Sequence, residues 1–464
     1  MPPLCPQCRS DLPAPPARGG GEYTACPRCG TIVRAGPPRR PARRAAPWAW
    51  AVAAAFAVLV AGAVALLAFA GGTGEEPVAH PGRPPVSHNA HTGPGYVGAF
   101  CLPGGKVGAS SFCWGGTALA FNPARHSLFL VGHDQEQAVA EVEIPAAVVN
   151  SANLNDLPTA KILQPFVKVT ARVPNYTLKG NVKVGGLLVE SGRLVGTLYE
   201  YYDADAKAVQ SHFVLDSLDL AAAQVSGLFT VGTFGGGFVG GYLAPVPAEW
   251  QDELGAPTVT GQAALCIIGR TSSGPALFGF DPKDLGPSPA PVRPYVYYPL
   301  PHPLGKIDAR NPYFNGNTEI RGVFFVPGTP TVVFFGAHGT GDVGYGQPEP
   351  FNDPHRGSKG WHSVNGEYAY QVWAYDVRDF VAVKDGAKKP WEVKPTEVRT
   401  FEFPVDNAAK HLGGVAFDPA AGRLYVSQLW AGGGDALPLI HVFQVPKDPS
   451  LSWLQAKPKV PGTP

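Results

Sequence analysis

The chain has 464 residues, of which 57 are Gly and 50 are Pro, and only 16 % are charged. This composition disfavours long helices, because Pro removes a backbone donor and Gly costs backbone entropy, whereas 24 Phe, 16 Tyr and 9 Trp are enough for a sizeable core. The formal net charge of +1 provides no basic surface for nucleic acid, and seven Cys in so long a chain exclude a small disulfide-stabilised domain.

Two Cys-x-x-Cys pairs lie near the N-terminus. The pairs are Cys5 with Cys8 and Cys26 with Cys29. Thiolates from two tight turns at this spacing can complete a tetrahedral Zn²⁺ site, and the segment resembles a zinc ribbon. We expect residues 1–34 to be a structural zinc module that takes most of its folding energy from the metal. A redox dithiol pair is the alternative, although the βαβ context of such a pair is missing.

An apolar segment follows a basic linker. The linker, residues 35–47, contains four arginines, and the apolar residues 48–70 carry no charge. A segment of this length crosses the ~30 Å hydrocarbon core of a bilayer. Because basic residues stay on the cytoplasmic side, we expect an uncleaved transmembrane signal anchor with the zinc module in the cytoplasm. A cleaved signal peptide is the alternative, since Ala68-Phe69-Ala70 fits a cleavage site, but the region before the apolar run is too long for one.

The rest of the chain is therefore expected outside the cytoplasm. Residues 71–95 are rich in Gly and Pro and lack apolar periodicity, so we expect a tether. Residues 96–446 form the outer domain, and residues 447–464 form a C-terminal tail.

The outer domain repeats one unit of short apolar strands. The unit is an apolar strand opened by glycine, a tight turn, a second strand, a loop and a third strand. The clearest copies begin at Gly115 and Gly413, and weaker copies begin near Gly186, Gly237 and Gly322. Repeats of this kind are typical of architectures built from one supersecondary unit.

A fourth strand can be placed before the first strand of each copy. The candidates are Val97–Leu102, Val167–Val173, Leu228–Gly232, Tyr295–Leu300 and Val398–Phe403. The last copy has only three strands from Gly413 onward, while Val97–Leu102 stands alone before the first copy. Pairing of Val97–Leu102 with Leu439–Val445 would therefore close a ring and remove its free edges. We therefore predict an all-β fold, a five-bladed β-propeller. A β-sandwich or two smaller β domains is the alternative.

The whole arrangement resembles that of bacterial membrane-anchored β-propeller proteins with an N-terminal zinc-ribbon-like module. The resemblance implies a single-pass membrane protein with its propeller outside the cytoplasm. It implies no particular reaction.

The loops of a propeller emerge on two faces. Loops from second to third strands and from fourth strands to the next first strand share what we call the long-loop face, and the others share the short-turn face. The short turns here, such as Asn122-Pro123-Ala124-Arg125, have ordinary turn chemistry. The long-loop face carries an insertion, Ala337 to Glu367, of a length that is typical of functional loops.

Side chains of the long-loop face and of the inner-strand entrances should converge at the mouth of the central channel, the default site hypothesis. We expect ligand contacts there from Trp114, His133, Lys183, Arg321, His338, His411 and Trp430. If the protein is an enzyme, the candidate catalytic carboxylates are Asp134, Glu319 and Asp342. Glycoside hydrolases use two carboxylates about 5–9 Å apart, and some of them are five-bladed propellers.

Structural roles compete with these assignments. His133 with Asp134, and His338 with Asp342, suit a metal site or a general base with its orienting group, but each pair could also close a β-hairpin by a hydrogen bond. Glu319 could form a stabilising ion pair with Arg321.

The remaining cysteines lie in the outer domain. Cys101 and Cys113 flank the connection into the first copy, so in an oxidising compartment a disulfide between them would lock the closed ring. Two free thiols are the alternative. Cys266, on a predicted middle strand, is expected to be a buried small hydrophobe.

The sequence thus predicts a membrane-anchored binding or sensing protein. Its outer propeller would recognise a glycan, a peptide or an envelope protein, by analogy with other propellers. A propeller hydrolase acting on polysaccharide is the alternative. No G-x-S-x-G, P-loop or HExxH motif is present.

Overall fold

The computed structural model describes residues 93–454 except 175, 204, 347–352, 357–359 and 449, together with the backbone of residues 23–25 and 32–34. The chain divides into two units, Met1–Ser87 and His88–Pro464. In the first unit, β1 (Tyr23–Ala25) pairs antiparallel with β2 (Ile32–Arg34).

Two predictions concern residues that the structure does not describe. The expected zinc ligands Cys5, Cys8, Cys26 and Cys29 and the expected anchor at residues 48–70 lie outside the described residues. Within the residues that are described, no helix combines the length and the apolarity needed to span a bilayer.

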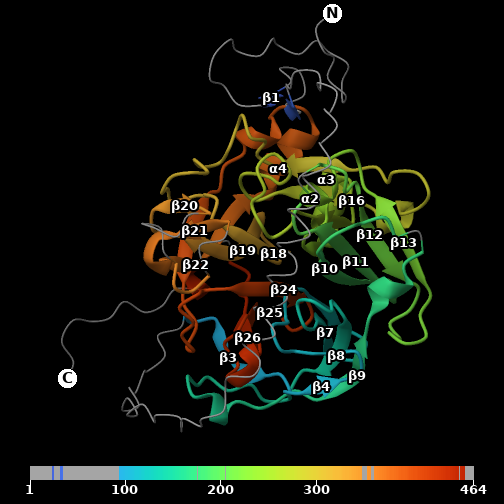
Figure 1. The fold of residues 1–464 in the computed structure, drawn as a ribbon, viewed down its shortest axis with the longest axis vertical. Helices are drawn as coiled ribbons and strands as arrows, with labels where there is room; N and C mark the ends of the chain where they lie inside the picture. The colour runs from blue at the N-terminus through green and yellow to red at the C-terminus, as the bar shows by residue number, and fades with distance from the viewer. Residues whose placement is uncertain are drawn as a thin grey trace, which may run out of the picture. The chain divides into compact units, whose positions relative to one another are not determined.

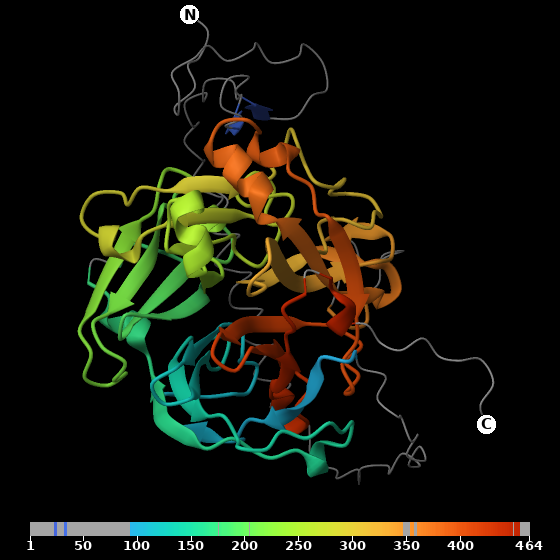
Figure 2. The same cartoon turned by 180° about the vertical axis from the view of Figure 1, so that it is seen from behind.

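The second unit contains five four-stranded antiparallel sheets arranged around a common axis, as Figures 1 and 2 show. From the innermost strand outward, blade one is β6 (Leu119–Asn122), β7 (Ser127–Val131), β8 (Val139–Glu143) and β9 (Ile162–Val167), and blade two is β10 (Val182–Glu190), β11 (Arg193–Glu200), β12 (Gln210–Leu215) and β13 (Val225–Thr230). Blade three is β14 (Leu243–Pro245), β15 (Thr258–Thr260), β16 (Leu277–Phe280) and β17 (Arg293–Val296), and blade four is β18 (Glu319–Phe325), β19 (Thr331–Gly339), β22 (Tyr368–Asp376) and β23 (Glu397–Phe401). Blade five is β24 (Leu412–Asp418), β25 (Arg423–Gln428), β26 (Leu439–Gln444) and the N-terminal β3 (Tyr96–Cys101).

The connections between strands contain the remaining elements. These are the hairpins β4 (Lys106–Val107) with β5 (Ser110–Ser111) and β20 (Val343–Tyr345) with β21 (Trp361–Ser363), the helices α2 (Gly236–Val239), α3 (Ala248–Leu254) and α4 (Val377–Lys384), and the 3₁₀ helices η1 (Leu154–Asp156), η2 (Val169–Arg172), η3 (Pro282–Asp284), η4 (Val364–Gly366), η5 (Pro390–Glu392), η6 (Gly434–Ala436) and η7 (Ser452–Leu454).

The predicted ring closure is confirmed. Strand β3 pairs antiparallel with β26, with Cys101 opposite Leu439 and Gly98 opposite Val442. The Tyr96 hydroxyl lies 2.9 Å from Nδ1 of His441, so the closing pair is also joined by a buried side-chain hydrogen bond. The fold is an all-β, five-bladed propeller whose fifth sheet contains both ends of the domain.

Glycines lie at or near the start of the inner strands, where neighbouring strands approach too closely for a side chain. The inner strands β6, β10, β14, β18 and β24 contact one another in turn around the ring. A Cβ atom on Gly185 would lie 2.0 Å from the Gly240 oxygen, and one on Gly413 would lie 2.1 Å from the Gly116 oxygen. The recurring glycines in the sequence therefore mark the places where the blades touch at the axis.

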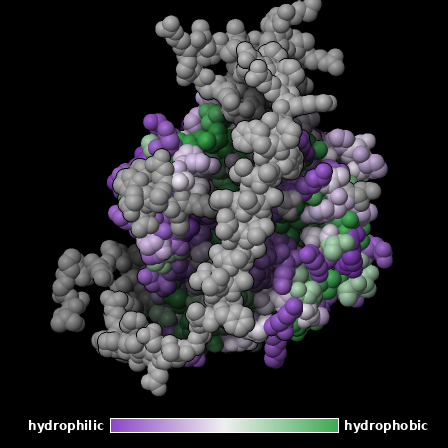
Figure 3. Space-filling view, in the orientation of Figure 1, coloured by the Kyte–Doolittle hydropathy of each residue, from purple (hydrophilic) through white to green (hydrophobic). Residues whose placement is uncertain are grey.

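Apolar side chains fill the space between successive sheets. One cluster joins blades one and two around Phe213, a second joins blades three and four around Trp373, and comparable clusters fill the other gaps between blades. On the face seen in Figure 3, the hydrophobic residues form separate patches among hydrophilic ones. The core is therefore distributed around the ring, and each blade depends on both of its neighbours.

Several predicted strands are displaced. The fourth strand of blade one is β9, because η2 occupies most of the predicted Val167–Val173. Blade three begins at Leu243, since the glycine-rich segment near Gly237 forms α2. Strands β13 and β17 also begin earlier than predicted.

The predicted disulfide between Cys101 and Cys113 is wrong, because both cysteines are free. The Cys113 thiol donates to the Asp435 oxygen at 2.6 Å, and Cys101 Sγ lies 4.0 Å from the Leu154 oxygen. The two sulfurs thus contact different loops. Cys266 is buried and free, as expected.

We expect Gly185→Ala to lower the free energy of unfolding by about 3 kcal/mol, because the new methyl group would overpack against the Gly240 carbonyl at the ring axis. Gly104→Ala is the matched control, since its Cβ would meet only Leu437 Cδ1 at 3.8 Å. Denaturant unfolding of residues 80–464 measures both. Equal stability of the two variants would contradict the steric explanation.

Candidate functional site

Exposed large apolar side chains gather on the long-loop face. In the described part of the chain they are Trp114, Tyr176, Tyr201, Tyr202, Val209, Ile268, Tyr313 and Tyr345. All of them lie in connections from second to third strands or from fourth to first strands. An exposed apolar surface confined to one face of a molecule marks an interaction surface.

Loops from different blades meet on this face. The side chain of Tyr345, in the blade-four insertion, is hydrogen-bonded to that of Tyr202, in the blade-two loop, and burial together with this bond raises the pKa of Tyr345. The Tyr345 ring also packs edge-on against Trp361 at a centroid distance of 4.9 Å. Tyr202, Tyr345 and Trp361 therefore form one aromatic surface that joins blades two and four.

A buried carboxylate lies at the entrance of the blade-four inner strand. Glu319 opens β18, and its Oε1 lies 3.2 Å from Arg356 Nη1, while its Oε2 lies 3.3 Å from Arg321 Nη2. His411, directly before β24, places Nδ1 3.7 Å from Oε2. Desolvation raises the pKa of Glu319, but the charges of Arg356 and Arg321 outweigh it and hold that pKa well below its usual value. Glu319 is therefore a permanent anion at neutral pH.

The insertion in blade four supplies Arg356. Its Nε donates to the Ala409 oxygen at 2.8 Å and its Nη2 to the Lys410 oxygen at 3.3 Å. The guanidinium also lies 3.8 Å from the centre of the Tyr368 ring, whose hydroxyl donates to Asp353 Oδ2 at 2.6 Å. These contacts hold Arg356 from several sides and join the insertion to blade five.

A second ion pair comes from blades one and two. Lys183 Nζ lies 2.5 Å from Asp134 Oδ2 and also donates to the Asp134 backbone oxygen at 2.9 Å. The Lys183 side chain is 6 % exposed and that of Asp134 is 45 % exposed. Asp134 therefore offers its carboxylate to solvent while its lysine partner is buried.

The two ion-pair groups form one cluster around Tyr199. Burial raises the pKa of Tyr199 to about 12, and the charges of Arg321, Glu319 and Asp134 all act on its hydroxyl. Tyr199 is the penultimate residue of β11, two residues before the exposed Tyr201. Side chains from blades one, two, four and five therefore meet at the entrance of the ring.

Two tryptophans extend this cluster to solvent. Trp114 and Trp430 pack edge-to-face with centroids 5.0 Å apart, and Trp430 packs against His411 at 4.2 Å. Trp114, Trp430 and Lys410 have left-handed backbone conformations, with φ of 55°, 61° and 49°. Such conformations cost energy for residues with bulky side chains and concentrate at functional sites. Trp114 is 44 % exposed, so this strained pair presents an aromatic surface to solvent.

Three other predicted site residues lie elsewhere. His338 is buried in β19, with Nδ1 2.8 Å from Thr318 Oγ1 and Nε2 2.7 Å from the Asn311 oxygen, so both ring nitrogens are occupied. Asp342 is exposed in the insertion. His133 accepts from the Gln135 backbone N–H at 3.2 Å rather than pairing with Asp134. Among the residues described, no group of three His, Cys, Asp or Glu side chains could hold a metal ion.

Sequence reasoning missed Arg356 and Tyr368 as members of the cluster. Arg356 was visible as a basic residue within a long polar insertion, but the spacing along the chain carries no information about which buried carboxylate it reaches. Tyr368 opens a strand and reads as an ordinary core residue.

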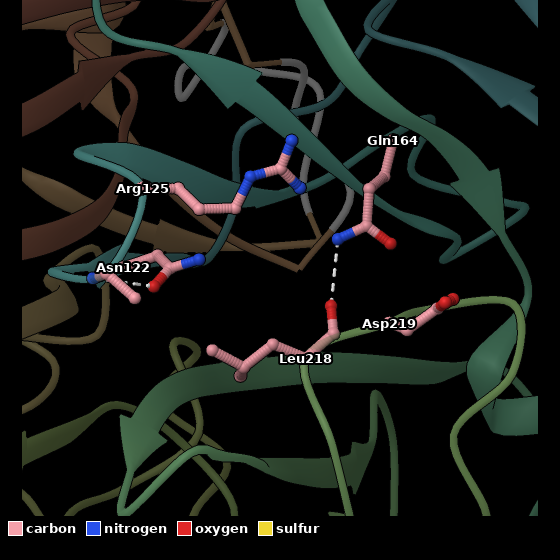
Figure 4. Close-up of a pocket in the computed structure, with 6 residues that line it drawn as sticks. Asn122, Arg125, Gln164, Leu218 and Asp219 are labelled. Atoms are coloured by element: carbon pink, nitrogen blue, oxygen red, sulfur yellow. Dashed lines mark hydrogen bonds between the residues drawn. The ribbon is translucent and has the colours of Figure 1, made fainter.

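The short-turn face carries a pocket of about 340 Å³ between blades one and two, with Asn122, Arg125, Gln164, Leu218 and Asp219 around it (Figure 4). Beneath it, the fully buried Glu141 carboxylate accepts hydrogen bonds from Asn122, Arg125 and Gln164 at 2.7–2.8 Å. Gln164 also donates to the Leu218 oxygen. Because these polar groups are hydrogen-bonded to one another, we assign a structural role to the residues that line the pocket.

No protein-family model matches the chain, and no curated protein matches it. Among solved structures, it is similar to an exo-1,5-alpha-L-arabinanase from a bovine ruminal metagenomic library (9 % identity, 71 % of this chain and 93 % of that chain, TM-score 0.35). It is also similar to a GH43_1 enzyme from Xanthomonas citri (12 % identity, 71 % of this chain and 87 % of that chain, TM-score 0.39). A third similar structure is a glycosyl hydrolase from Bacteroides ovatus (12 % identity, 79 % of this chain and 94 % of that chain, TM-score 0.33). At these values the likeness carries no functional argument, and the fold assignment rests on the strand pairing.

We expect Glu319→Gln to lower the free energy of unfolding by about 4 kcal/mol, because it leaves Arg321 and Arg356 buried without their shared carboxylate. Glu253→Gln, at an exposed position of α3, should change it by less than about 0.5 kcal/mol. Denaturant unfolding compares the two variants. A loss as small as that of the control would show that the cluster contributes nothing to stability.

The stability of the propeller should fall as the pH drops from 6.5 towards 4. Burial lowers the pKa of His411 and of His338 to about 4 and that of His212 to about 3, and the charge of Arg356 adds to the shift at His411. The unfolded chain then binds more protons than the folded one in this window, which costs up to about 1.4 kcal/mol per pH unit for each histidine. His411→Gln should make the midpoint of thermal unfolding less dependent on pH between 4 and 6.5. An unchanged pH dependence in this variant would contradict the assignment.

Proposed function

We propose that the long-loop face of the propeller binds carbohydrate, centred on the Trp114–Trp430 pair and the Glu319 cluster. The observation that carries this proposal is the confinement of exposed aromatic side chains to that face. Aromatic faces pack against the C–H faces of sugar rings, and the polar edges of Tyr and Trp hydrogen-bond to hydroxyl groups.

The polar groups beside the tryptophans fit the same ligand. The Asp134 carboxylate is partly exposed and held in place by Lys183, and His411 is neutral and packed against Trp430. Preorganised acceptors and donors beside an aromatic surface select a ligand that is polar at its edges and apolar on its faces. A sugar has this character, whereas a peptide would more often require an apolar pocket for its side chains.

The proposal includes the topology predicted from the N-terminal sequence. The anchor at residues 48–70 would place the propeller outside the cytoplasm, and the four N-terminal cysteines would hold Zn²⁺ on the cytoplasmic side. The ligand would then be an extracytoplasmic glycan. These assignments stay predictions, because they concern residues outside the described part of the chain.

Polysaccharide hydrolysis is the second candidate function. It is favoured by the presence of two carboxylates, Asp134 and Glu319, whose charges both raise the pKa of Tyr199 at the ring entrance. A glycosidase also needs a protonated carboxyl as general acid. Glu319, held as an anion by two arginines, cannot supply that proton while Arg356 is in place. The geometry therefore supports binding better than hydrolysis.

We expect the propeller to bind at least one soluble polysaccharide in a panel of arabinan, xylan, dextran and polygalacturonate, and Trp114→Ala to weaken that binding at least tenfold. Loss of an aromatic surface of this size removes about 1.4 kcal/mol or more. Affinity electrophoresis of residues 80–464 measures the binding, with Trp114→Phe retaining part of the affinity. Arg378→Ala, on the short-turn face, should leave it unchanged.

The same samples separate the alternatives. Release of reducing ends by the wild type, lost in Glu319→Gln, would establish hydrolysis instead of simple recognition. Absence of binding to every polysaccharide, together with binding to an envelope protein or peptide, would overturn the carbohydrate proposal.

A further inference from the structure

We propose that the carbohydrate bound on the long-loop face is acidic, and that Arg321 holds the carboxylate of a uronate unit. This inference rests on the proposed function and goes further, because it names the chemical class of the sugar. It comes from the unequal hydrogen bonding of the two arginines that share Glu319.

Arg321 uses little of its hydrogen-bonding capacity within the protein. A guanidinium carries five N–H donors. The described contacts of Arg321 contain one hydrogen bond, from Nη2 to Glu319 at 3.3 Å, and its buried Nε has no partner. Leaving a buried donor unsatisfied costs about 1–3 kcal/mol.

Arg356 provides the internal comparison. Its guanidinium donates to Glu319 and to two backbone oxygens and stacks on Tyr368. Both arginines belong to the same cluster, yet one is held on several sides and the other by a single long bond. The contrast assigns Arg356 to the structure of the site and leaves Arg321 available for a ligand.

Arg321 forms its ion pair with a carboxylate, Glu319, that Arg356 also contacts, and the charge of Asp134 also acts on Arg321. Lys183 is paired with Asp134. Arg356 Nη1 contacts Oε1 of Glu319 at 3.2 Å, and Arg321 Nη2 contacts Oε2 at 3.3 Å. His411 is neutral. Asp353 accepts from the Tyr368 hydroxyl and from the backbone N–H groups of His355 and Arg356, and Lys410 pairs with Glu402 and Asp406. Arg321 must therefore share one carboxylate with Arg356 and His411.

A carboxylate is the ligand group that best matches this donor. The planar guanidinium binds carboxylates through parallel hydrogen bonds that are stronger than those between neutral groups. The Arg321 side chain is 15 % exposed, and it lies near Tyr199, whose neighbour Tyr201 is on the aromatic surface. A sugar packed on that surface could thus present a ring carboxylate to Arg321.

The experiment compares oligosaccharides that differ only in the carboxyl group. Tetramers of galacturonate, glucuronate and mannuronate, each beside its carboxyl-reduced counterpart, are titrated calorimetrically into residues 80–464. We expect at least one acidic tetramer to bind at least tenfold more tightly than its reduced form. Arg321→Gln should abolish that preference by weakening the binding of the acidic tetramer, while Arg321→Lys, which keeps the charge without the planar fork, should retain part of it.

Each outcome decides the proposal. Equal affinity for the acidic and the reduced member of every pair would overturn the acidic-ligand proposal and leave carbohydrate binding intact. A preference for the acidic tetramer that survives in Arg321→Gln would have the same consequence. Loss of the preference in Arg378→Gln as well would show a general charge effect and overturn it too. Failure of every tetramer, together with failure of the polysaccharide panel, would instead overturn the proposed function itself. The wild-type comparison stands even if a variant does not fold.

Discussion

Five inner strands meet at the axis of this propeller at distances that leave no room for side chains where they touch. The contacts between Gly185 and Gly240, and between Gly413 and Gly116, set how closely the blades approach. Because the strands converge there, residues at their entrances are brought together from distant parts of the sequence. The ring closure by β3 and β26 keeps this convergence in place. The candidate site depends on both.

Charged residues that converge at the ring entrance are costly to bury, and the insertion of blade four reduces part of this cost. Glu319 would be costly as an isolated buried anion, and Arg321 as an isolated buried cation. Arg356 adds a second cation, and two of its other donors bond to the Ala409 and Lys410 backbone oxygens just before β24. The insertion is therefore part of the site, and the incomplete hydrogen bonding of Arg321 is what remains after the protein's own groups have been paired.

The two faces of the ring differ in how their polar groups are used. On the short-turn face, Glu141 accepts hydrogen bonds from side chains that tie the strands of blade one together and reach blade two through Gln164. On the long-loop face, Trp114 and Asp134 remain partly exposed and Arg321 is partly unsatisfied. Completed networks stabilise a fold, whereas groups left exposed in fixed positions are available to a ligand. This difference is why we place function on the long-loop face.

The sequence by itself determined the architecture, because glycine spacing, strand alternation and turn residues are local signals that repeat with each blade. It also indicated that Lys183, Glu319, Arg321 and His411 lie at the ring entrance, since each lies directly before, or among the first three residues of, an inner strand. Only the tertiary structure decided which partners these side chains have. Asp134 pairs with Lys183 instead of its neighbour His133, Cys101 and Cys113 stay apart, and Arg356 reaches Glu319 from a loop without periodicity. Ion pairs and thiol contacts between blades depend on the directions of side chains across the ring, and no spacing along one chain segment encodes those directions.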